Sequence, residues 1–128
     1  MNLLLDTHVA LWAIADSPKL PEHARARIQN PKVVVWVSSA SVWEIAIKYT
    51  LGRGDMPVSA ADALAYFRAS GYRLLPIEAE HTVALAELPA HHHDPFDRLL
   101  IAQALSEPLR LMTHDATVAR YNSTIIQI

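Results

Sequence analysis

The fold is decided by the stretch 33-VVVWVSSASVWEIAIKYTLG-52. Its first five residues, 33–37, are apolar and mostly β-branched, which predicts a strand buried on both faces, as parallel strands between two helix layers are. Apolar side chains then recur at helical spacing from Val42 to Tyr49, and Gly52 ends the pattern. This spacing predicts a helix for the rest of the stretch. The stretch is therefore one strand–helix unit of an α/β protein.

The same alternation continues in both directions from this unit. Further strands are predicted at residues 2–5, 72–77, 109–113 and 124–128, and further helices at residues 7–15, 21–28, 59–70, 78–88, 95–105 and 114–121. Strands that alternate with helices favour an α/β sandwich with a mostly parallel central sheet. No repeat, low-complexity tract or linker interrupts the chain. Residues 1–128 are therefore expected to form a single domain.

The composition is that of a folded protein with one core: 128 residues, of which 52% are hydrophobic and 19% charged. There is no cysteine, which excludes disulfides and cysteine-based zinc sites and suits a reducing compartment. The first residues, MNLLLDTH, lack the basic region of a signal peptide, and no apolar run is long enough to span a membrane. A cytoplasmic protein without a membrane partner is expected.

Four acidic residues fall where the predicted elements meet: Asp6, Glu44, Asp97 and Asp115. Each lies at the carboxyl end of a predicted strand or near the amino end of a predicted helix. In an open parallel sheet these ends lie along one edge, where ligands bind at the point at which the strand order reverses. Four carboxylates in one crevice repel one another unless protons or cations offset their charge. Because the ligands are all oxygens, a hard divalent cation, Mg²⁺ or Mn²⁺, is expected at neutral pH.

Three of these acids also have a structural interpretation. Asp6 could cap the helix that follows it. Glu44 could complete a capping box with Ser41, although the helix could equally begin at the serines of residues 38–39. Asp115 could belong to a turn that leads into a short helix. The positions of the acids alone do not decide between these roles and a shared site.

The run 91-HHHDPFDRLLIAQA-104 contains two aspartates, which local geometry separates. Asp94 followed by Pro95 fits an N-cap and the first helical position, where proline needs no N–H partner. Asp97 then lies in the first turn, with its carboxylate free to face the crevice. The three histidines at 91–93 are not predicted to bind a metal, because adjacent side chains diverge and no second cluster completes a tetrahedral set.

Four stretches together resemble the PIN-domain family, and particularly the VapC-like toxins of type II toxin–antitoxin (VapBC) pairs. They are LLLDTHVALW at 3–12, SSASVWEIAIKYTLGR at 38–53, HDPFDRLLIAQA at 93–104 and LMTHD at 111–115. The likeness covers nearly the whole chain. It implies a single PIN domain over 1–128, with a Rossmann-like three-layer sandwich and a five-stranded, mostly parallel central sheet.

The resemblance also implies an activity, a cofactor and partners. The expected activity is that of a metal-dependent endoribonuclease, which hydrolyses RNA phosphodiester bonds with Mg²⁺ or Mn²⁺ held by Asp6, Glu44, Asp97 and Asp115. The expected partners are a second copy in a homodimer and a cognate antitoxin. The tail of such an antitoxin covers the acidic cleft, and its DNA-binding half represses the operon.

The charge of the chain fits an RNA substrate only after the site acids are set apart. A net charge of −2 and a pI near 6.4 argue against a general nucleic-acid binder. Four of the thirteen acidic residues belong to the candidate site, however, so the rest of the chain, with eleven lysines and arginines, is slightly basic. The candidate substrate contacts, all close in sequence to a site acid, are Thr7, Lys48, Arg98 and Thr113.

Two other functions stay open at the level of sequence. An acidic α/β pocket could serve phosphotransfer or act as a phosphatase, although Asp6-Thr7-His8 lacks the second aspartate of the phosphatase motif. The acids could instead hold a basic peptide in a catalytically silent binding module. Metal-dependent RNA cleavage distinguishes the nuclease from both.

Overall fold

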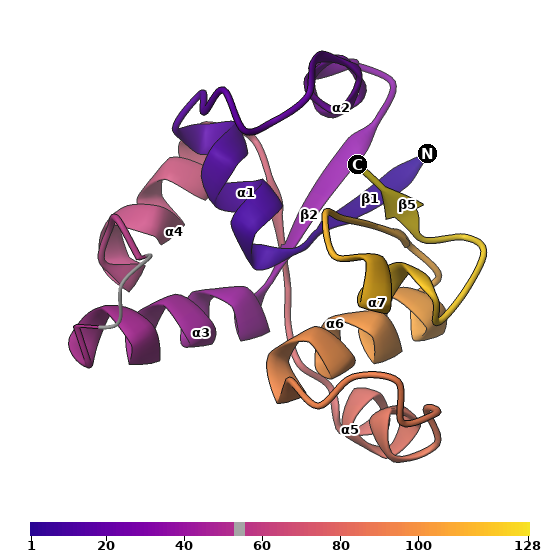
Figure 1. The fold of residues 1–128 in the computed structure, drawn as a ribbon. Helices are drawn as coiled ribbons and strands as arrows, with labels where there is room; N and C mark the ends of the chain where they lie inside the picture. Colours follow the sequence, from indigo (N-terminus) through magenta and orange to yellow (C-terminus); the bar gives the residue numbers. More distant parts are fainter. Residues whose placement is uncertain (53–55) are drawn as a thin grey trace.

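The computed structural model describes residues 1–52 and 56–128; Arg53, Gly54 and Asp55 lie outside the described residues. Within the described part, five strands and seven helices alternate along the chain, as the sequence predicts (Figure 1). The strands are β1 (Asn2–Leu5), β2 (Val34–Ser38), β3 (Arg73–Leu75), β4 (Arg110–Thr113) and β5 (Ile126–Gln127). The helices are α1 (Thr7–Ile14), α2 (Glu22–Gln29), α3 (Ser39–Thr50), α4 (Ala60–Ala69), α5 (Ala79–Ala86), α6 (Pro95–Ser106) and α7 (Ala116–Ala119).

The strands form one sheet in the order β3-β2-β1-β4-β5, and every pair is parallel. The chain first adds β2 and β3 on one side of β1 and then crosses back to place β4 on the other side. The order therefore reverses between β1 and β4, where a parallel sheet opens a crevice at its carboxyl edge. At this point the N–H of Asp6 donates to the carbonyl of Met112 over 3.0 Å.

Helices cover both faces of the sheet, so the predicted three-layer sandwich is confirmed (Figure 1). In β1, Leu3 and Leu5 pack in the core beneath α1, α2 and α4, whereas Leu4 packs in the core beneath α6. All three leucines are fully buried, because successive side chains of a strand point to opposite faces. Among the described residues, no helix has both the length and the apolar character needed to cross a membrane.

Three strands are shorter than the sequence predicts: β4 lacks one residue at its start, and β3 and β5 are shortened for local reasons. The strand predicted at 72–77 ends at Leu75, because Pro76 has no N–H to donate to a neighbouring strand. The strand predicted at 124–128 begins at Ile126, because the N–H of Thr124 donates to Asn122 Oδ1 over 2.9 Å in a turn.

A buried polar contact fixes α6 against the sheet. Ser38 Oγ, at the end of β2, donates to Gln103 Oε1 over 2.5 Å, and both side chains are fully buried. The Gln103 amide also donates to the Pro76 carbonyl at 3.2 Å and lies 3.3 Å from His81 Nδ1. This network sets the position of α6, and with it the position of Asp97 at the amino end of that helix.

Candidate active site at the carboxyl edge of the sheet

Asp6 ends β1 and serves both as a helix cap and as a member of the candidate site. Its Oδ1 accepts from the N–H of Val9 over 2.9 Å, so the capping interpretation is confirmed. Its Oδ2 accepts from Thr113 Oγ1 over 2.5 Å. Burial raises the pKa of Asp6, although these two hydrogen bonds and the nearby His114 lower it. The carboxylate is thus fixed in place but costly to ionise.

Glu44 is free to serve the site because the capping box that would hold it does not form. The N-cap of α3 is Ser38, whose Oγ accepts from the N–H of Ala40 over 2.9 Å. Glu44 therefore lies in the second turn and is only 3% exposed. Its Oε1 accepts from Thr7 Oγ1 over 2.7 Å, and its Oε2 from Lys48 Nζ over 2.5 Å.

Lys48 lies one turn beyond Glu44 and faces the acids. Partial burial lowers the pKa of Lys48, but its hydrogen bond to Glu44 and the charges of Glu44, Asp94 and Asp97 outweigh this effect, so the pKa is raised. A lysine that is held charged in this way offsets part of the negative charge of the cleft.

Asp94 and Asp97 divide as the sequence predicts. Asp94 caps α6, with its Oδ1 accepting from the N–H groups of Phe96 and Asp97 at 2.9 and 3.1 Å. Asp97 Oδ2 instead lies 2.8 Å from Nε2 of His92. The pKa of Asp97 is raised to about 6: burial is the main cause, the hydrogen bond to His92 lowers the pKa, and the charges of Asp94, Asp6 and Glu44 raise it. The pKa of Asp97 therefore shows that Asp6 and Glu44 lie close enough to repel its charge.

Asp115, the fourth candidate acid, lies between β4 and α7. Its Oδ1 caps α7 by accepting from the N–H groups of Thr117 and Val118 at 2.8 and 3.3 Å. Its Oδ2 lies 3.8 Å from Nε2 of His92. A single histidine nitrogen thus stands close to the carboxylates of both Asp97 and Asp115.

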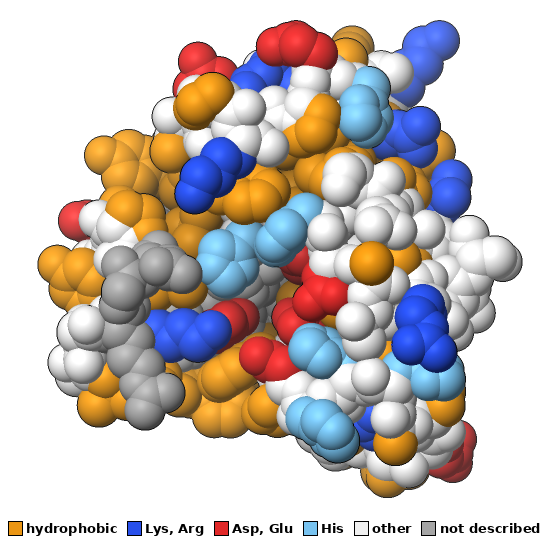
Figure 2. All heavy atoms as spheres, viewed as in Figure 1, with side chains coloured by type: hydrophobic (Ala, Val, Ile, Leu, Met, Phe, Trp, Pro, Cys, Tyr) orange, Lys and Arg blue, Asp and Glu red, His pale blue; other side chains and the backbone are white. Residues whose placement is uncertain are grey.

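The four acids come from distant parts of the chain and lie close together: the charges of Asp6 and Glu44 act on Asp97, and Asp97 and Asp115 both lie beside His92. Figure 2 shows acidic side chains gathered around a hollow, with histidines and a basic side chain beside them. Several carboxylate oxygens and imidazole nitrogens that converge in a partly buried cleft form a donor set for a divalent cation. Within the described chain, His92, Asp97 and Asp115 offer ligand atoms that all lie within 4.8 Å of one another. The residues present therefore fit a metal ion.

The predicted substrate contacts differ in what surrounds them. Thr7 and Thr113 are buried, and they hold Glu44 and Asp6 in place. Lys48 borders the cleft. Arg98 donates to the carbonyls of Pro89 and Leu85 and to the hydroxyl of Tyr121 at 2.9, 3.2 and 3.1 Å. No described ion pair joins Arg98 to a site acid, so its hydrogen bonds point to a structural role and give no support to substrate contact.

His92 is the site residue that the sequence analysis missed. The sequence analysis predicted no metal role for the three histidines, but the loop before α6 folds back so that His92 faces Asp97 and joins a group of possible ligands. The only signal in the sequence was its position just ahead of the helix cap at Asp94. Ser41, one of the serines that could have capped α3, instead lies buried, with its Oγ 2.9 Å from Thr7 Oγ1.

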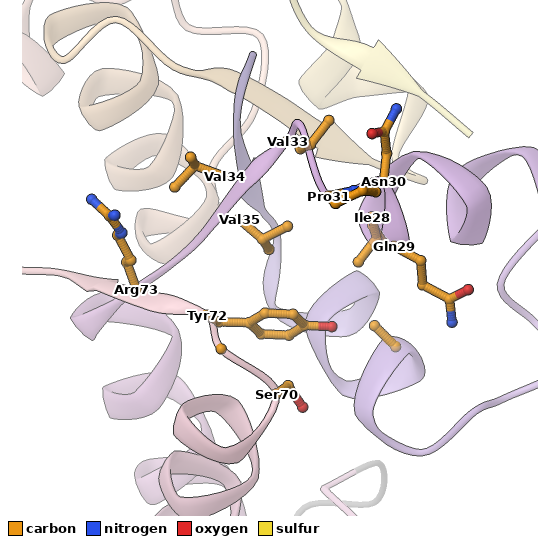
Figure 3. Close-up of a pocket in the computed structure, with 12 residues that line it drawn as sticks. Ile28, Gln29, Asn30, Pro31, Val33, Val34, Val35, Ser70, Tyr72 and Arg73 are labelled. Carbon is orange, nitrogen blue, oxygen red and sulfur yellow. The ribbon is translucent and has the colours of Figure 1, made fainter.

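A second hollow lies away from the acids (Figure 3). It has a volume of about 560 Å³ and is lined by residues at the starts of β2 and β3, including Val35, Tyr72 and Arg73. Among the residues that the structure describes, no Asp or Glu lines it. Because it sits at the amino ends of the strands and lacks carboxylates, it is not a candidate for the metal-dependent chemistry.

Solved structures with a similar fold include toxin–antitoxin proteins. VapBC2 from Rickettsia felis, bound to a DNA fragment from its promoter, is 19% identical with a TM-score of 0.71, covering 100% of this chain and 98% of that chain. DNA-bound VapBC from Salmonella typhimurium is 20% identical, with a TM-score of 0.68 and coverage of 100% and 97%. VapC20 from Mycobacterium tuberculosis, a sarcin–ricin loop cleaving toxin, is 14% identical, with a TM-score of 0.62 and coverage of 98% of both chains.

The sequence itself gives a direct family assignment. No curated protein matches the chain, but residues 3–123 match the family model of the PIN domain. The match includes all four candidate acids and four of the five described strands, and the solved structures above share the fold. The chain belongs to the PIN domain family.

Proposed function

We propose that this protein is a metal-dependent endoribonuclease, the toxin component of a toxin–antitoxin pair. One observation carries the proposal: Asp6, Glu44, Asp97 and Asp115 converge at the point where the strand order reverses, and their mutual repulsion favours a bound cation. Family membership and the likeness to VapBC structures support the same function.

Each acid has a distinct part in the proposed site. Asp6 and Asp97 are the primary metal ligands, Glu44 is a ligand or orients the attacking water, and Asp115 contributes from the margin. When bound, Mg²⁺ or Mn²⁺ would supply positive charge next to the scissile phosphate and lower the pKa of a bound water.

Residues around the acids prepare them for this role. Thr113 and the N–H of Val9 hold both oxygens of Asp6, and Thr7 and Lys48 hold those of Glu44. These bonds remove the rotational freedom of the carboxylates before substrate arrives, so less ordering is needed in the transition state.

RNA is the proposed substrate because the cleft combines a cation site with a basic margin. Lys48 forms an ion pair with the buried Glu44 at the edge of the acids, and its own side chain is 30% exposed. It is therefore the proposed contact for a phosphate oxygen of the RNA. The sarcin–ricin loop specificity of VapC20 belongs to that protein. For this chain the supported substrate class is RNA in general.

An antitoxin is the proposed protein partner. A groove of about 610 Å³ begins beside the acids at His8 and His114 and runs past Leu11 and Trp12 to Pro57. Its apolar side chains suit an extended or helical peptide with apolar side chains, and His114 at one end lies 4.0 Å from the Asp6 carboxylate. Co-expression with the product of the adjacent reading frame tests this pairing: a complex that lacks nuclease activity is expected, and free, active toxin in its presence would contradict it.

A homodimer is the proposed assembly. Tyr49, Leu51 and Tyr66 are 49%, 61% and 55% exposed, and a second copy that packed on them would remove this apolar surface from water. Light scattering coupled to gel filtration is expected to give twice the mass of the chain. A mass equal to one chain at all concentrations would contradict it.

Cleavage of a labelled RNA tests the nuclease activity. We expect cleavage with Mg²⁺ or Mn²⁺, none with EDTA, and a loss of at least about a hundredfold in Asp6→Asn and Asp97→Asn. Asp62→Asn is the matched control, because Asp62 is also an acid in the first turn of a helix but is exposed on α4. Equal cleavage by Asp97→Asn and Asp62→Asn would reject the proposed site.

A further inference from the structure

The loop at His91–His93 brings one imidazole into the acidic cleft. His92 Nε2 lies 2.8 Å from Asp97 Oδ2 and 3.8 Å from Asp115 Oδ2. These carboxylates belong to different elements, the first turn of α6 and the cap of α7. One nitrogen therefore stands between two candidate ligands that are far apart in the sequence.

The loop that carries His92 is held by a structural support of its own. The N–H of His92 donates to the hydroxyl of Tyr121 over 2.8 Å. The same hydroxyl accepts from Arg98 at 3.1 Å, and Arg98 also binds the carbonyls of Pro89 and Leu85. The His91 ring packs edge-on against Tyr121, with ring centroids 5.0 Å apart. His92 is thus positioned by residues that the nuclease chemistry does not use.

The spacing of the three ligand atoms suits a single ion. Two ligands at right angles around a metal, each at about 2.1 Å, lie about 3 Å from each other, and opposite ligands lie about 4.2 Å apart. His92 Nε2 and the two Oδ2 atoms lie at 2.8 and 3.8 Å, and all ligand atoms of the group fall within 4.8 Å. Small side-chain rotations would bring all three to coordination distance.

We propose that His92 is a metal ligand: with Asp97 and Asp115 it forms a mixed nitrogen–oxygen set that binds Mn²⁺ and neighbouring transition-metal ions in preference to Mg²⁺. Mg²⁺ is a hard ion that prefers oxygen ligands and retains its waters. Imidazole gives a larger gain to transition-metal ions. The inference rests on the proposed function in one respect, because it places the ion in the same cleft.

Tyr121 is a positioning residue in this arrangement. Its hydroxyl accepts from the His92 backbone rather than from the imidazole, so it fixes where the ring stands without touching the ion. Loss of this contact would leave the loop that carries the ligand less well positioned for the ion. Tyr121→Phe is therefore expected to weaken Mn²⁺ binding in the same direction as His92→Ala.

Metal binding in the absence of RNA tests the proposal. By calorimetry we expect the wild-type protein to bind Mn²⁺ at least about tenfold more tightly than Mg²⁺, and His92→Ala to remove most of that preference. His93→Ala is the matched control, since His93 is the exposed neighbour, and we expect it to retain the preference. An unchanged preference in His92→Ala would overturn the proposal.

Pulsed EPR of the Mn²⁺ complex gives a direct signature and needs no variant. We expect a ¹⁴N coupling from a coordinated imidazole in the wild type, present in His93→Ala and absent in His92→Ala. No ¹⁴N coupling in the wild type, or a coupling that persists in His92→Ala, would overturn the ligand role.

The outcomes separate this proposal from the nuclease assignment. Mg²⁺-dependent RNA cleavage with no ¹⁴N coupling would reject the His92 ligand and leave the nuclease standing. A ¹⁴N coupling that depends on His92, without any RNA cleavage, would support the ligand and reject the nuclease. A wild-type protein that binds neither metal would reject both.

Discussion

Thr113, at the end of β4, donates a 2.5 Å hydrogen bond to the Asp6 carboxylate at the end of β1, although 107 positions separate the two residues in the sequence. The same Thr113 oxygen accepts from the N–H of Asp115 over 3.0 Å. One hydroxyl therefore links the two acids on either side of the point where the strand order reverses. The arrangement of the site depends on this link.

Replacement of Thr113 by valine is expected to loosen both acids. The variant should lose about 1–2 kcal/mol of unfolding free energy, because a buried carboxylate and a backbone N–H each lose a partner. It should also bind Mg²⁺ more weakly. Urea unfolding and metal titration measure the two effects, and Thr113→Ser, which keeps the hydroxyl, is expected to restore both. A valine variant with wild-type metal affinity would contradict the positioning role.

The raised pKa of Asp97 predicts that the free energy of unfolding of the metal-free protein decreases as pH rises. Because its pKa is raised to about 6 in the folded state, the folded protein binds this proton more tightly than the unfolded chain. The contribution of Asp97 therefore favours folding below pH 4, declines as pH rises, and is fully unfavourable above the folded pKa. Asp97→Asn, which cannot ionise, should be more stable than wild type by about 3 kcal/mol at pH 7.

Urea unfolding in EDTA at pH 5 and pH 7 measures this difference. The advantage of Asp97→Asn should shrink to about half at pH 5, and saturating Mg²⁺ should stabilise the wild type but not the variant. A variant that is less stable than wild type at pH 7 without metal would contradict the electrostatic account.

Because Lys48 pairs with Glu44 at the edge of the acids, its replacement is expected to weaken RNA binding without weakening metal binding. Lys48→Met removes a cation that borders the acids, so the KM for RNA should rise several-fold while Mg²⁺ affinity is retained or increased. Lys48→Arg should keep the KM close to wild type. Steady-state cleavage measures the KM, and metal titration measures the Mg²⁺ affinity. A loss of Mg²⁺ affinity in Lys48→Met would contradict the proposal that Lys48 serves RNA binding and not metal binding.

Replacement of Gln103 is expected to lower the free energy of unfolding, because its buried amide joins α6 to the sheet. Gln103→Leu leaves the hydroxyl of Ser38 and the carbonyl of Pro76 without their buried partner, which should cost about 2 kcal/mol of unfolding free energy. Gln29→Leu, on the exposed face of α2, should change stability by less than about 0.5 kcal/mol. Chemical denaturation of the two variants measures the contrast, and equal stability would contradict it.

The elements and their layers could be predicted from the sequence because each depends on local periodicity. The run at 33–37 has no polar residue and indicated a strand that is covered on two sides, and the run at 2–5, apolar after Asn2, indicated a second strand. The acids could be predicted as a group because parallel strands share one carboxyl edge. Local caps were also predictable, as Asp94 followed by Pro95 shows.

The detailed partners could not be predicted, because they depend on contacts between distant segments. His92 faces Asp97 because Tyr121, 29 positions away, holds its backbone. Thr7 and Thr113 resembled surface contacts in the sequence, yet folding buries them against Glu44 and Asp6. The sequence did not decide which of Ser38, Ser39 and Ser41 caps α3, and in the structure the N-cap is Ser38.

The central claim is that the four acids gather to hold a divalent cation, and a crystal soaked in Mn²⁺ tests it most directly. We expect an anomalous difference peak at the manganese edge within coordination distance of the Asp97 carboxylate and of at least one other of the four acids. A soaked crystal that shows bound manganese elsewhere, with no peak in this cleft, would contradict the account.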